Sequence, residues 1–376
     1  MKVATGALVA ALGLTAATAA QAQFYLLGPT DTPSSVTNSG IVAGYDDKSY
    51  FTWSVAGGKT PIPGTIPGNG TGGIARITED GLKLGATNRN PDNGLTEIAS
   101  YDAATGKWTT YGSLGASSGD SASGGFGMNA SGTVQVGNAW VDAGNAHAIV
   151  VRDGVLTDLG SNIAGRSSRA DAVSNDGRLI GGYQDREDGY RSAAVWVDGV
   201  EQLLEYNGIP LQQVNGISGN GEWAVGGGGY ATGGSAYMWN ATTGDIKLLD
   251  NPFADAGFEL RATSVSFDGS VVIGYGEDFF FSRMGWIWTE ATGTMAMEDY
   301  ASQFAGYSGE FLLGPLAVSQ DGRNITGYGI NADWTAYTGW MISVPVPEPA
   351  TWASMALGLG LLALVGRRRT ARAQRG

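Results

Sequence analysis

The stretch "AVSNDGRLIGGYQDREDGYRSAAVWVDGVEQLLEYNG", from Ala172 to Gly208, decides the fold because its pattern recurs along the chain. Its first apolar run meets Asp176-Gly177, where glycine supplies the positive φ of a two-residue hairpin turn. A second apolar run ends in glycine before Tyr183, and a variable polar loop leads to a third run that carries Trp196. A second turn, at Asp198-Gly199, precedes a fourth run. The unit therefore predicts four antiparallel strands.

The chain holds seven copies of this unit, whose turn glycines are Gly40, Gly81, Gly132, Gly177, Gly221, Gly269 and Gly322. Successive turn glycines are 41 to 53 residues apart, with a mean spacing of 47. The 61 glycines, 11 tryptophans and 15 tyrosines favour strands and tight turns over helices. A four-stranded unit at such a period is typical of a β-propeller. The sequence predicts an all-β, seven-bladed β-propeller over residues 23–345, with a β-solenoid-like repeat array as the alternative.

The last copy indicates how the ring would close. It stops at "GWMISVP" without a fourth strand, whereas "QFYLLG", from Gln23, resembles the fourth strands of the other copies. We expect Phe24 to Leu27 to pair with the strand around Trp340 to Ser343, because closing a ring with strands from both ends leaves no exposed sheet edge. A solenoid would need no such exchange.

Aromatic side chains fall into two groups. One large aromatic recurs at the same place in the third strand of five copies, at Trp53, Trp196, Trp239, Trp288 and Trp340. Such recurrence favours a core between blades over a sugar-binding platform. The aromatics of the variable loops are the better surface candidates: Phe279, Phe280, Phe281 and Trp334.

The composition excludes several kinds of chemistry. The chain has no cysteine and one histidine, His147, so one subunit cannot form a disulfide, a thiolate zinc site, a catalytic triad or a multi-histidine metal site. Without the leader and the tail, which carry six basic residues and one acidic residue, the body has a charge near −18. Such a surface repels phosphate backbones, so we expect no nucleic-acid partner. We expect a non-enzymatic protein with no catalytic residues, no cofactor and no metal site.

Two alternatives of another class stay open. Acidic residues gather in one variable loop of three copies, at Asp46-Asp47, at Asp185, Glu187 and Asp188, and at Glu277-Asp278. They suggest a calcium-dependent adhesin, although none has the spacing of a defined calcium loop. Loop carboxylates on one face of the propeller could equally be the catalytic acids of a carbohydrate-active enzyme. The sequence does not indicate which two carboxylates would form the catalytic pair. The G-x-G-x-x-G match at 68–73 has no surrounding βαβ unit, so we interpret it as a loop.

One copy carries a recognisable strand start. The run "NAHAIVVRDGVLTDLG", residues 145–160, contains His147-Ala148-Ile149. It resembles the HAF-type repeat of bacterial extracellular proteins, which is named for a His-Ala-Phe start, and the resemblance extends over most of residues 36–345. The family implies no agreed activity, and His147 is interpreted as a strand-start residue.

The chain begins with a predicted signal peptide. "MKVATGALVAALGLTAATAAQAQ" has one lysine, a small and apolar stretch, and the A-x-A cleavage pattern Ala20-Gln21-Ala22. Cleavage is expected before Gln23. The predicted domains are the signal peptide at 1–22, the propeller at 23–345 and a sorting tail at 346–376.

The tail has three parts: Pro347-Glu348-Pro349, an apolar run at 350–365, and the cluster Arg367, Arg368 and Arg369. As a helix, the 16 apolar residues would span about 24 Å, slightly less than a hydrocarbon core of about 30 Å. We expect a single transmembrane helix whose arginines stay in the cytoplasm.

This tail closely resembles the PEP-CTERM sorting signal of Gram-negative bacteria, which is also catalogued as an ice-binding protein C-terminal domain. The resemblance implies recognition by an exosortase, a membrane transpeptidase-like enzyme, with removal of the tail. It also implies association with exopolysaccharide and biofilm matrix. A permanent anchor is the alternative, and ice binding is not expected because the chain has no regular Thr-x-Thr array.

Together these features predict a protein exported across the inner membrane of a Gram-negative bacterium. It would be anchored in that membrane before processing and reach the cell surface or extracellular matrix afterwards. The expected role is structural or adhesive, with exopolysaccharide as a candidate partner.

Overall fold

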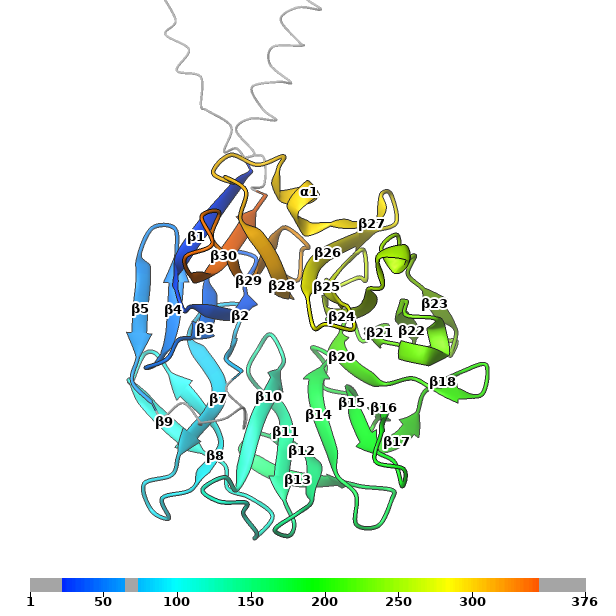
Figure 1. Ribbon diagram of the computed structural model, residues 1–376. Helices are drawn as coiled ribbons and strands as arrows, with labels where there is room; N and C mark the ends of the chain where they lie inside the picture. Colours follow the sequence, from blue (N-terminus) through cyan, green and yellow to red (C-terminus); the bar gives the residue numbers. More distant parts are fainter. Residues whose placement is uncertain (1–21, 65–73, 345–376) are drawn as a thin grey trace, which may run out of the picture. The chain divides into compact units, whose positions relative to one another are not determined.

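The computed structural model describes residues 22–64 and 74–344, in which Gln23–Ser343 form one compact unit. The unit is built almost entirely of β-strands, with one short helix, α1 (Met297–Ala301), and two 3₁₀ turns, Gly229–Thr232 and Ala254–Ala256. Figure 1 shows the sheets side by side around a common centre, in the order of the chain. The expected all-β class is confirmed.

Antiparallel four-stranded sheets make up most of this unit, and each matches one predicted repeat. The first sheets along the chain are β2 (Thr32–Val36), β3 (Val42–Tyr45), β4 (Tyr50–Ser54) and β5 (Gly58–Ile62); then β6 (Arg76–Ile77), β7 (Lys83–Arg89), β8 (Thr96–Asp102) and β9 (Lys107–Thr110). They are followed by β10 (Ser123–Met128), β11 (Val134–Trp140), β12 (Ala146–Arg152) and β13 (Val155–Gly160); then β14 (Ser168–Val173), β15 (Leu179–Asp185), β16 (Arg191–Val197) and β17 (Val200–Leu203).

The next two repeats share one eight-stranded sheet, because a single residue pair, Gly227 with Arg261, joins them. Its strands are β20 (Gln213–Ile217), β21 (Trp223–Gly227), β22 (Ala236–Asn240), β23 (Ile246–Leu248), β24 (Glu259–Val265), β25 (Val271–Glu277), β26 (Arg283–Thr289) and β27 (Gly293–Ala296). A small hairpin, β18 (Glu205–Tyr206) and β19 (Ile209–Pro210), precedes it.

The remaining sheet contains both ends of the compact unit. Its order is β1 (Gln23–Pro29), β30 (Tyr337–Ser343), β29 (Asn324–Ile330) and β28 (Phe311–Val318). Phe24 pairs with Ile342 and Leu26 with Trp340, in antiparallel register. The predicted exchange of the N-terminal strand into the last repeat is therefore confirmed, and the solenoid alternative, which needs no such pairing, is not supported.

The recurrent tryptophans form the core, as expected. Trp196 and Trp340 are fully buried, and Trp53, Trp239 and Trp288 are nearly so. Each lies on the third strand of its repeat, where its ring packs with aliphatic residues of neighbouring strands. Because these rings are buried, they cannot form a sugar-binding surface.

The hairpin turn of each repeat differs from the prediction. All seven turn glycines have positive φ, between 70° and 81°, as expected. The turn is longer than two residues, however: the backbone of Ser174 accepts from Gly177 and donates to Leu179. The buried hydroxyl of Ser174 donates to Asp176 at 2.6 Å and accepts from the backbone N–H of Leu179 at 3.1 Å. Side-chain hydrogen bonds thus stabilise a wider turn in which only glycine needs the left-handed conformation.

No helix among residues 22–64 and 74–344 is long and apolar enough to span a membrane. The transmembrane helix expected at 350–365 lies outside the described residues, and so does most of the predicted signal peptide.

Candidate functional site

The turns between the first and second strands bond to one another around the ring. The second residue of each turn is one of Asn38, Glu79, Ala130, Asn175, Gly219, Phe267 and Gln320. Most of these residues line one end of the central cavity. The backbone N–H of Asn175 donates to Gly219 at 3.0 Å, and that of Phe267 donates to Gln320 at 2.8 Å. A hydrogen-bonded circle of turns therefore borders the cavity at this end, which has a volume of about 460 Å³.

The circle also joins the last repeat to the first. The backbone N–H of Asp321 donates to the side-chain carbonyl of Asn38 at 2.9 Å. The amide of Asn324 donates to the carbonyls of Thr37 and Asn38, at 2.9 and 3.0 Å. The sequence pattern gave each turn its glycine, but sequence analysis did not anticipate these links between turns.

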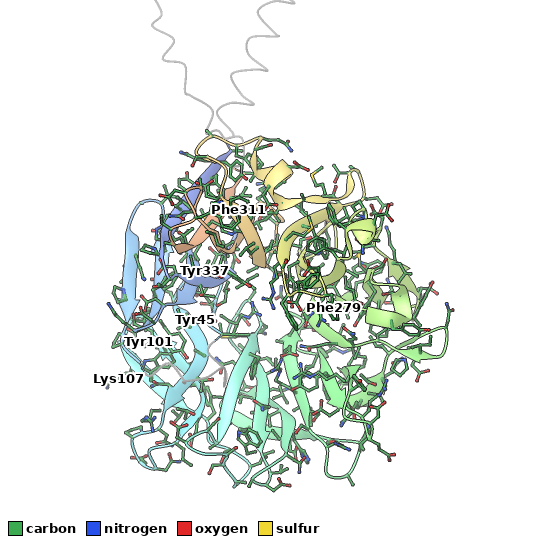
Figure 2. The ribbon with its side chains drawn as sticks, viewed as in Figure 1. Tyr45, Tyr101, Lys107, Phe279, Phe311 and Tyr337 are labelled. Carbon is green, nitrogen blue, oxygen red and sulfur yellow. The ribbon has the colours of Figure 1, made fainter. Side chains whose placement is uncertain are left out.

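A second cavity, of about 330 Å³, lies toward the opposite end of the ring. We use "the mouth" for this cavity, whose lining includes Tyr45, Tyr275, Tyr328, Arg76, Arg169 and Arg283. The tyrosines follow the recurring glycine of the second strand, so the periodic sequence places them at one end of three different sheets. In Figure 2, Tyr45 and Phe279 lie to the left and right of the middle of the ring.

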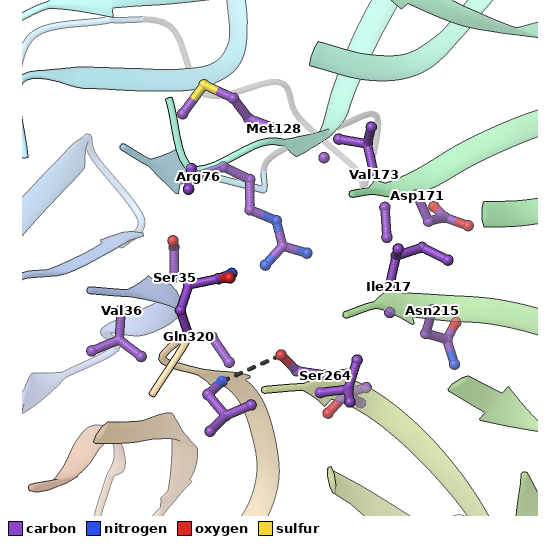
Figure 3. A pocket seen from close by; sticks show the side chains of 18 of the residues that line it. Ser35, Val36, Arg76, Met128, Asp171, Val173, Asn215, Ile217, Ser264 and Gln320 are labelled. Atoms are coloured by element: carbon purple, nitrogen blue, oxygen red, sulfur yellow. Dashed lines mark hydrogen bonds between the residues drawn. The ribbon is translucent and has the colours of Figure 1, made fainter. Parts of the chain in front are cut away.

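Arg76 lines both the mouth and an adjoining pocket of about 110 Å³. It projects from β6, and Figure 3 shows its guanidinium pointing into the space between Ser35 and Asp171. Its Nε donates to the carbonyl of Phe126 at 3.0 Å and its Nη1 to that of Ser34 at 2.6 Å. Within the described part of the chain, no carboxylate lies in ion-pair distance of Arg76. Burial lowers the pKa of Arg76 to about 10, opposed by the charge of Asp171, so Arg76 stays charged at neutral pH.

A second arginine, Arg169 of β14, is paired and stacked. Its Nε donates to Asp171 at 2.7 Å, and its guanidinium lies over the rings of Phe126, at 4.2 Å, and Tyr183, at 4.9 Å. Asp171 also accepts from the amide of Gln213 at 3.0 Å. Burial raises the pKa of Asp171, although Arg169 opposes the shift.

The third arginine, Arg283, is held at the start of β26. Its Nε donates to Glu277 at 2.7 Å, its Nη1 donates to the hydroxyl of Tyr328 at 2.8 Å, and its guanidinium lies 4.5 Å from the ring of Tyr275. The ring of Tyr275, the hydroxyl of Tyr328 and the carboxylate of Glu277 therefore fix this cation at the rim of the mouth. Sequence analysis did not predict the three arginines, Arg76, Arg169 and Arg283, because each lies in a different repeat. The recurring Gly-Tyr pair was the only sequence signal for the position of the mouth.

The acidic loops are engaged in ion pairs. Asp46 pairs with Lys59, Asp188 with Arg186, and Glu277 with Arg283, and Asp185 lies 3.8 Å from Arg191. Among the described residues, no group of three or more histidine, aspartate or glutamate side chains is arranged to hold a metal ion. The arrangement gives the calcium alternative no support.

The other predicted residues are spread over the molecule. His147 is the second residue of β12, and its Nδ1 lies 3.1 Å from the carboxylate of Asp158. The loop aromatics are exposed as expected, with Phe279 at 89% and Trp334 at 65%. Gln23 begins β1 and Ala22 directly precedes it.

Several residues that the sequence singles out lie outside the described residues: Ala20, Pro347, Glu348, Pro349, Arg367, Arg368 and Arg369, together with the glycine-rich segment at 68–73.

Comparison with known proteins identifies the tail. Residues 345–369 match the PEP-CTERM protein-sorting motif. This range includes the Pro-Glu-Pro sequence, the apolar run and the arginine cluster. No curated protein matches the chain. The comparisons give no support to the expected HAF-type repeat or to the ice-binding protein C-terminal domain.

Solved structures similar to the chain identify the fold of the body. A chain of "Crystal Structure of Mitotic Checkpoint Complex" is 15% identical, with a TM-score of 0.51, covering 92% of this chain and 99% of that one. The β-propeller domain of the Trilobed protease from Pyrococcus furiosus is 11% identical, with a TM-score of 0.50, covering 88% and 97%. A prolyl endopeptidase is 12% identical, with a TM-score of 0.50, covering 85% of this chain and 51% of that one. The chain is thus an all-β protein with a propeller-like body and a PEP-CTERM motif after it.

Proposed function

We propose that this chain is an exported, seven-bladed, non-enzymatic propeller that an exosortase-type system sorts to the surface of a Gram-negative cell. The observation that carries the proposal is the match of residues 345–369 to the PEP-CTERM protein-sorting motif. The motif supports export and sorting, because its arginines would retain the tail in the membrane until a processing enzyme reads Pro347-Glu348-Pro349.

The remaining parts of the chain are consistent with that route. The leader at 1–22 would direct the chain across the inner membrane. The cysteine-free body needs no oxidative folding and relies on packing. The run at 350–365 would form the transient transmembrane helix, so the processed protein would carry no anchor, as in other tail-cleaved surface proteins.

The hydrogen-bonded turns support the proposed blade count. A ring closes only when its last unit meets its first, and the bond from Asp321 to Asn38 joins the last turn to the first. With one turn per repeat, the circle supports seven blades, two of them sharing the eight-stranded sheet.

The role at the surface would be structural or adhesive, with exopolysaccharide as the partner. The mouth places tyrosine rings and arginine side chains at one end of the ring, and exposed phenylalanines occupy the loop 279–281, just before Arg283. Aromatic and arginine side chains are the residues that most often anchor binding surfaces.

Alanine substitution of Pro347, Glu348 and Pro349 tests the sorting. We expect the variant to accumulate at full length in the inner membrane, whereas the parent is shortened and released to the surface or medium. Pro345→Ala, in the same proline-rich segment but outside the Pro-Glu-Pro sequence, is the matched control and should be processed normally. Unchanged processing of the triple variant, judged by fractionation and intact mass, would refute sorting through this tail.

A hydrolysis screen tests the non-enzymatic assignment. The purified chain is incubated with a panel of polysaccharides, and the release of reducing ends is measured. We expect no turnover; turnover that disappears on mutating Asp171 or Glu277 would instead establish a carbohydrate-active enzyme.

A further inference from the structure

We infer that the mouth binds a single carboxylate-bearing sugar residue, a uronate, at an end or branch of an acidic polysaccharide. This inference rests on the proposed surface role and names the ligand class for it. The cavity of about 330 Å³ falls at the lower end of the size range of small-molecule sites, about 300–1,000 Å³.

Arg76 supplies the first part of the argument. A guanidinium carries five N–H donors, and two of those of Arg76 are used, both on neutral backbone carbonyls. Arg76 lines the mouth and also the adjoining pocket of about 110 Å³ that Figure 3 draws, and its guanidinium points into that pocket. A partly buried cation without a carboxylate partner is costly unless an anion or water compensates it. Arg76 is therefore the natural partner of a carboxylate that enters the mouth, because guanidinium and carboxylate match in two parallel hydrogen bonds.

The other two arginines are already occupied, which limits the charge of the ligand. Arg169 pairs with Asp171, and Arg283 pairs with Glu277. The mouth therefore has three arginines and only two carboxylates paired with them, so one positive charge, that of Arg76, is not balanced. A ligand with one negative charge balances it, whereas a doubly charged phosphate would bring an uncompensated charge into an acidic protein.

The tyrosines explain why the carboxylate would be carried by a sugar. Rings of Tyr45, Tyr275 and Tyr328 border the mouth, and aromatic faces pack against the apolar faces of sugar rings. Burial raises the pKa of Tyr45, so its hydroxyl stays protonated and can donate to a sugar oxygen. Tyr328 is held in place by the bond from Arg283. The site is therefore preorganised, which limits the entropy lost on binding.

Isothermal titration of the full chain, purified in detergent, with glucuronate, glucose and inorganic phosphate tests this inference. We expect glucuronate to bind about tenfold or more tightly than either glucose or phosphate. Glucose lacks the carboxylate that would form a charge-assisted pair with Arg76, and phosphate carries more negative charge than the mouth can balance. Arg76→Gln should remove that preference, whereas Arg178→Gln, an exposed arginine paired with Asp198, should keep it. Equal binding of glucuronate and glucose, tighter binding of phosphate, or a preference that survives Arg76→Gln would each overturn the inference.

A second variant keeps the test decisive if Arg76→Gln does not fold, since Arg76 bonds to two strands of neighbouring sheets. Tyr328→Phe removes only a hydroxyl that faces Arg283. We expect it to weaken the binding of glucuronate several-fold while the melting temperature of the protein stays within a few degrees. Unchanged affinity for glucuronate would contradict the proposed site. If glucuronate does not bind as expected but the tail is processed normally, only the proposed ligand is refuted. If glucuronate binds as expected but the tail is not processed, only the proposed sorting is refuted.

Discussion

The backbone N–H of Asp321 donates to the Oδ1 of Asn38 at 2.9 Å, although 283 residues of chain separate the two. The bond joins the last hairpin turn to the first, at the end of the ring that the turns border. A second closure lies in the sheet that contains β1 and β30, where Phe24 pairs with Ile342. The ring is thus closed at two levels, one in the turns and one in the strands.

Asn324 holds the closure of the turns and provides the first prediction. Its amide donates to the carbonyls of Thr37 and Asn38, and its carbonyl accepts from Ser343. Asn324→Leu would remove all three hydrogen bonds of this buried side chain, so we expect the free energy of unfolding to fall by about 2–4 kcal/mol. Urea denaturation measures this, with Asn162→Leu, at an exposed position, as the control. Equal stability of the two variants would mean that the closure contributes nothing.

The strand closure predicts a contrast between two residues of β1. Phe24 is 2% exposed, with its ring 6.3 Å from that of Trp340 and 5.4 Å from that of Tyr307, whereas Leu26 is 46% exposed. Phe24→Ala should cost about 3–5 kcal/mol of stability through the cavity that it creates, and Leu26→Ala less than about 1 kcal/mol. Similar losses in thermal or chemical unfolding would show that β1 does not close the core.

Glu298 predicts how stability depends on pH. Burial raises the pKa of this carboxyl above its ordinary value of 4.5, although the backbone N–H of Leu312 donates to it at 2.8 Å. The folded state therefore binds its proton more tightly than the unfolded state, and stability is lost as pH rises from about 4.5 through the folded pKa. Glu298→Gln keeps an acceptor for Leu312, so it should match the parent below pH 4.5 and exceed it in stability at neutral pH.

Unfolding titrations at several pH values check this prediction, with Asp299→Asn, an exposed neighbour, as the control. A parent that is more stable than Glu298→Gln at neutral pH would contradict the sign derived from burial.

The proposed adhesive role predicts that replacing the exposed phenylalanines weakens adhesion and leaves stability unchanged. Phe279 and Phe280 are 89% and 82% exposed, and their rings meet edge to face at 5.6 Å. Replacing both with serine should reduce retention of the protein on matrix polysaccharide by several-fold without lowering the melting temperature, because surface substitutions away from packed groups change stability little. Tyr230→Ser, at another exposed aromatic, is the control. Unchanged retention would place the contact surface elsewhere.

Much of the fold could be predicted because its signals are local and repeated. Each copy places its apolar runs, its glycine and its third-strand tryptophan at nearly the same positions, so period and alternation predict the strands, the turns and the core. The missing last strand even predicted the pairing of Phe24 with the strand of Trp340. The predicted length of the turn between the first and second strands of a repeat was wrong. Side-chain hydrogen bonds such as that from Ser174 to Asp176 widen this turn beyond the two residues that Asp-Gly suggests.

The sequence by itself determined the all-β repeat architecture, the exchange of the end strands and the PEP-CTERM tail, since each depends on residues that are close together or regularly spaced. Only the tertiary structure decided the mouth, where Arg76, Tyr275 and Tyr328 come from three different repeats. Residues about 200 to 250 positions apart meet there because of the way the sheets twist and pack against one another around the ring, which no local pattern encodes.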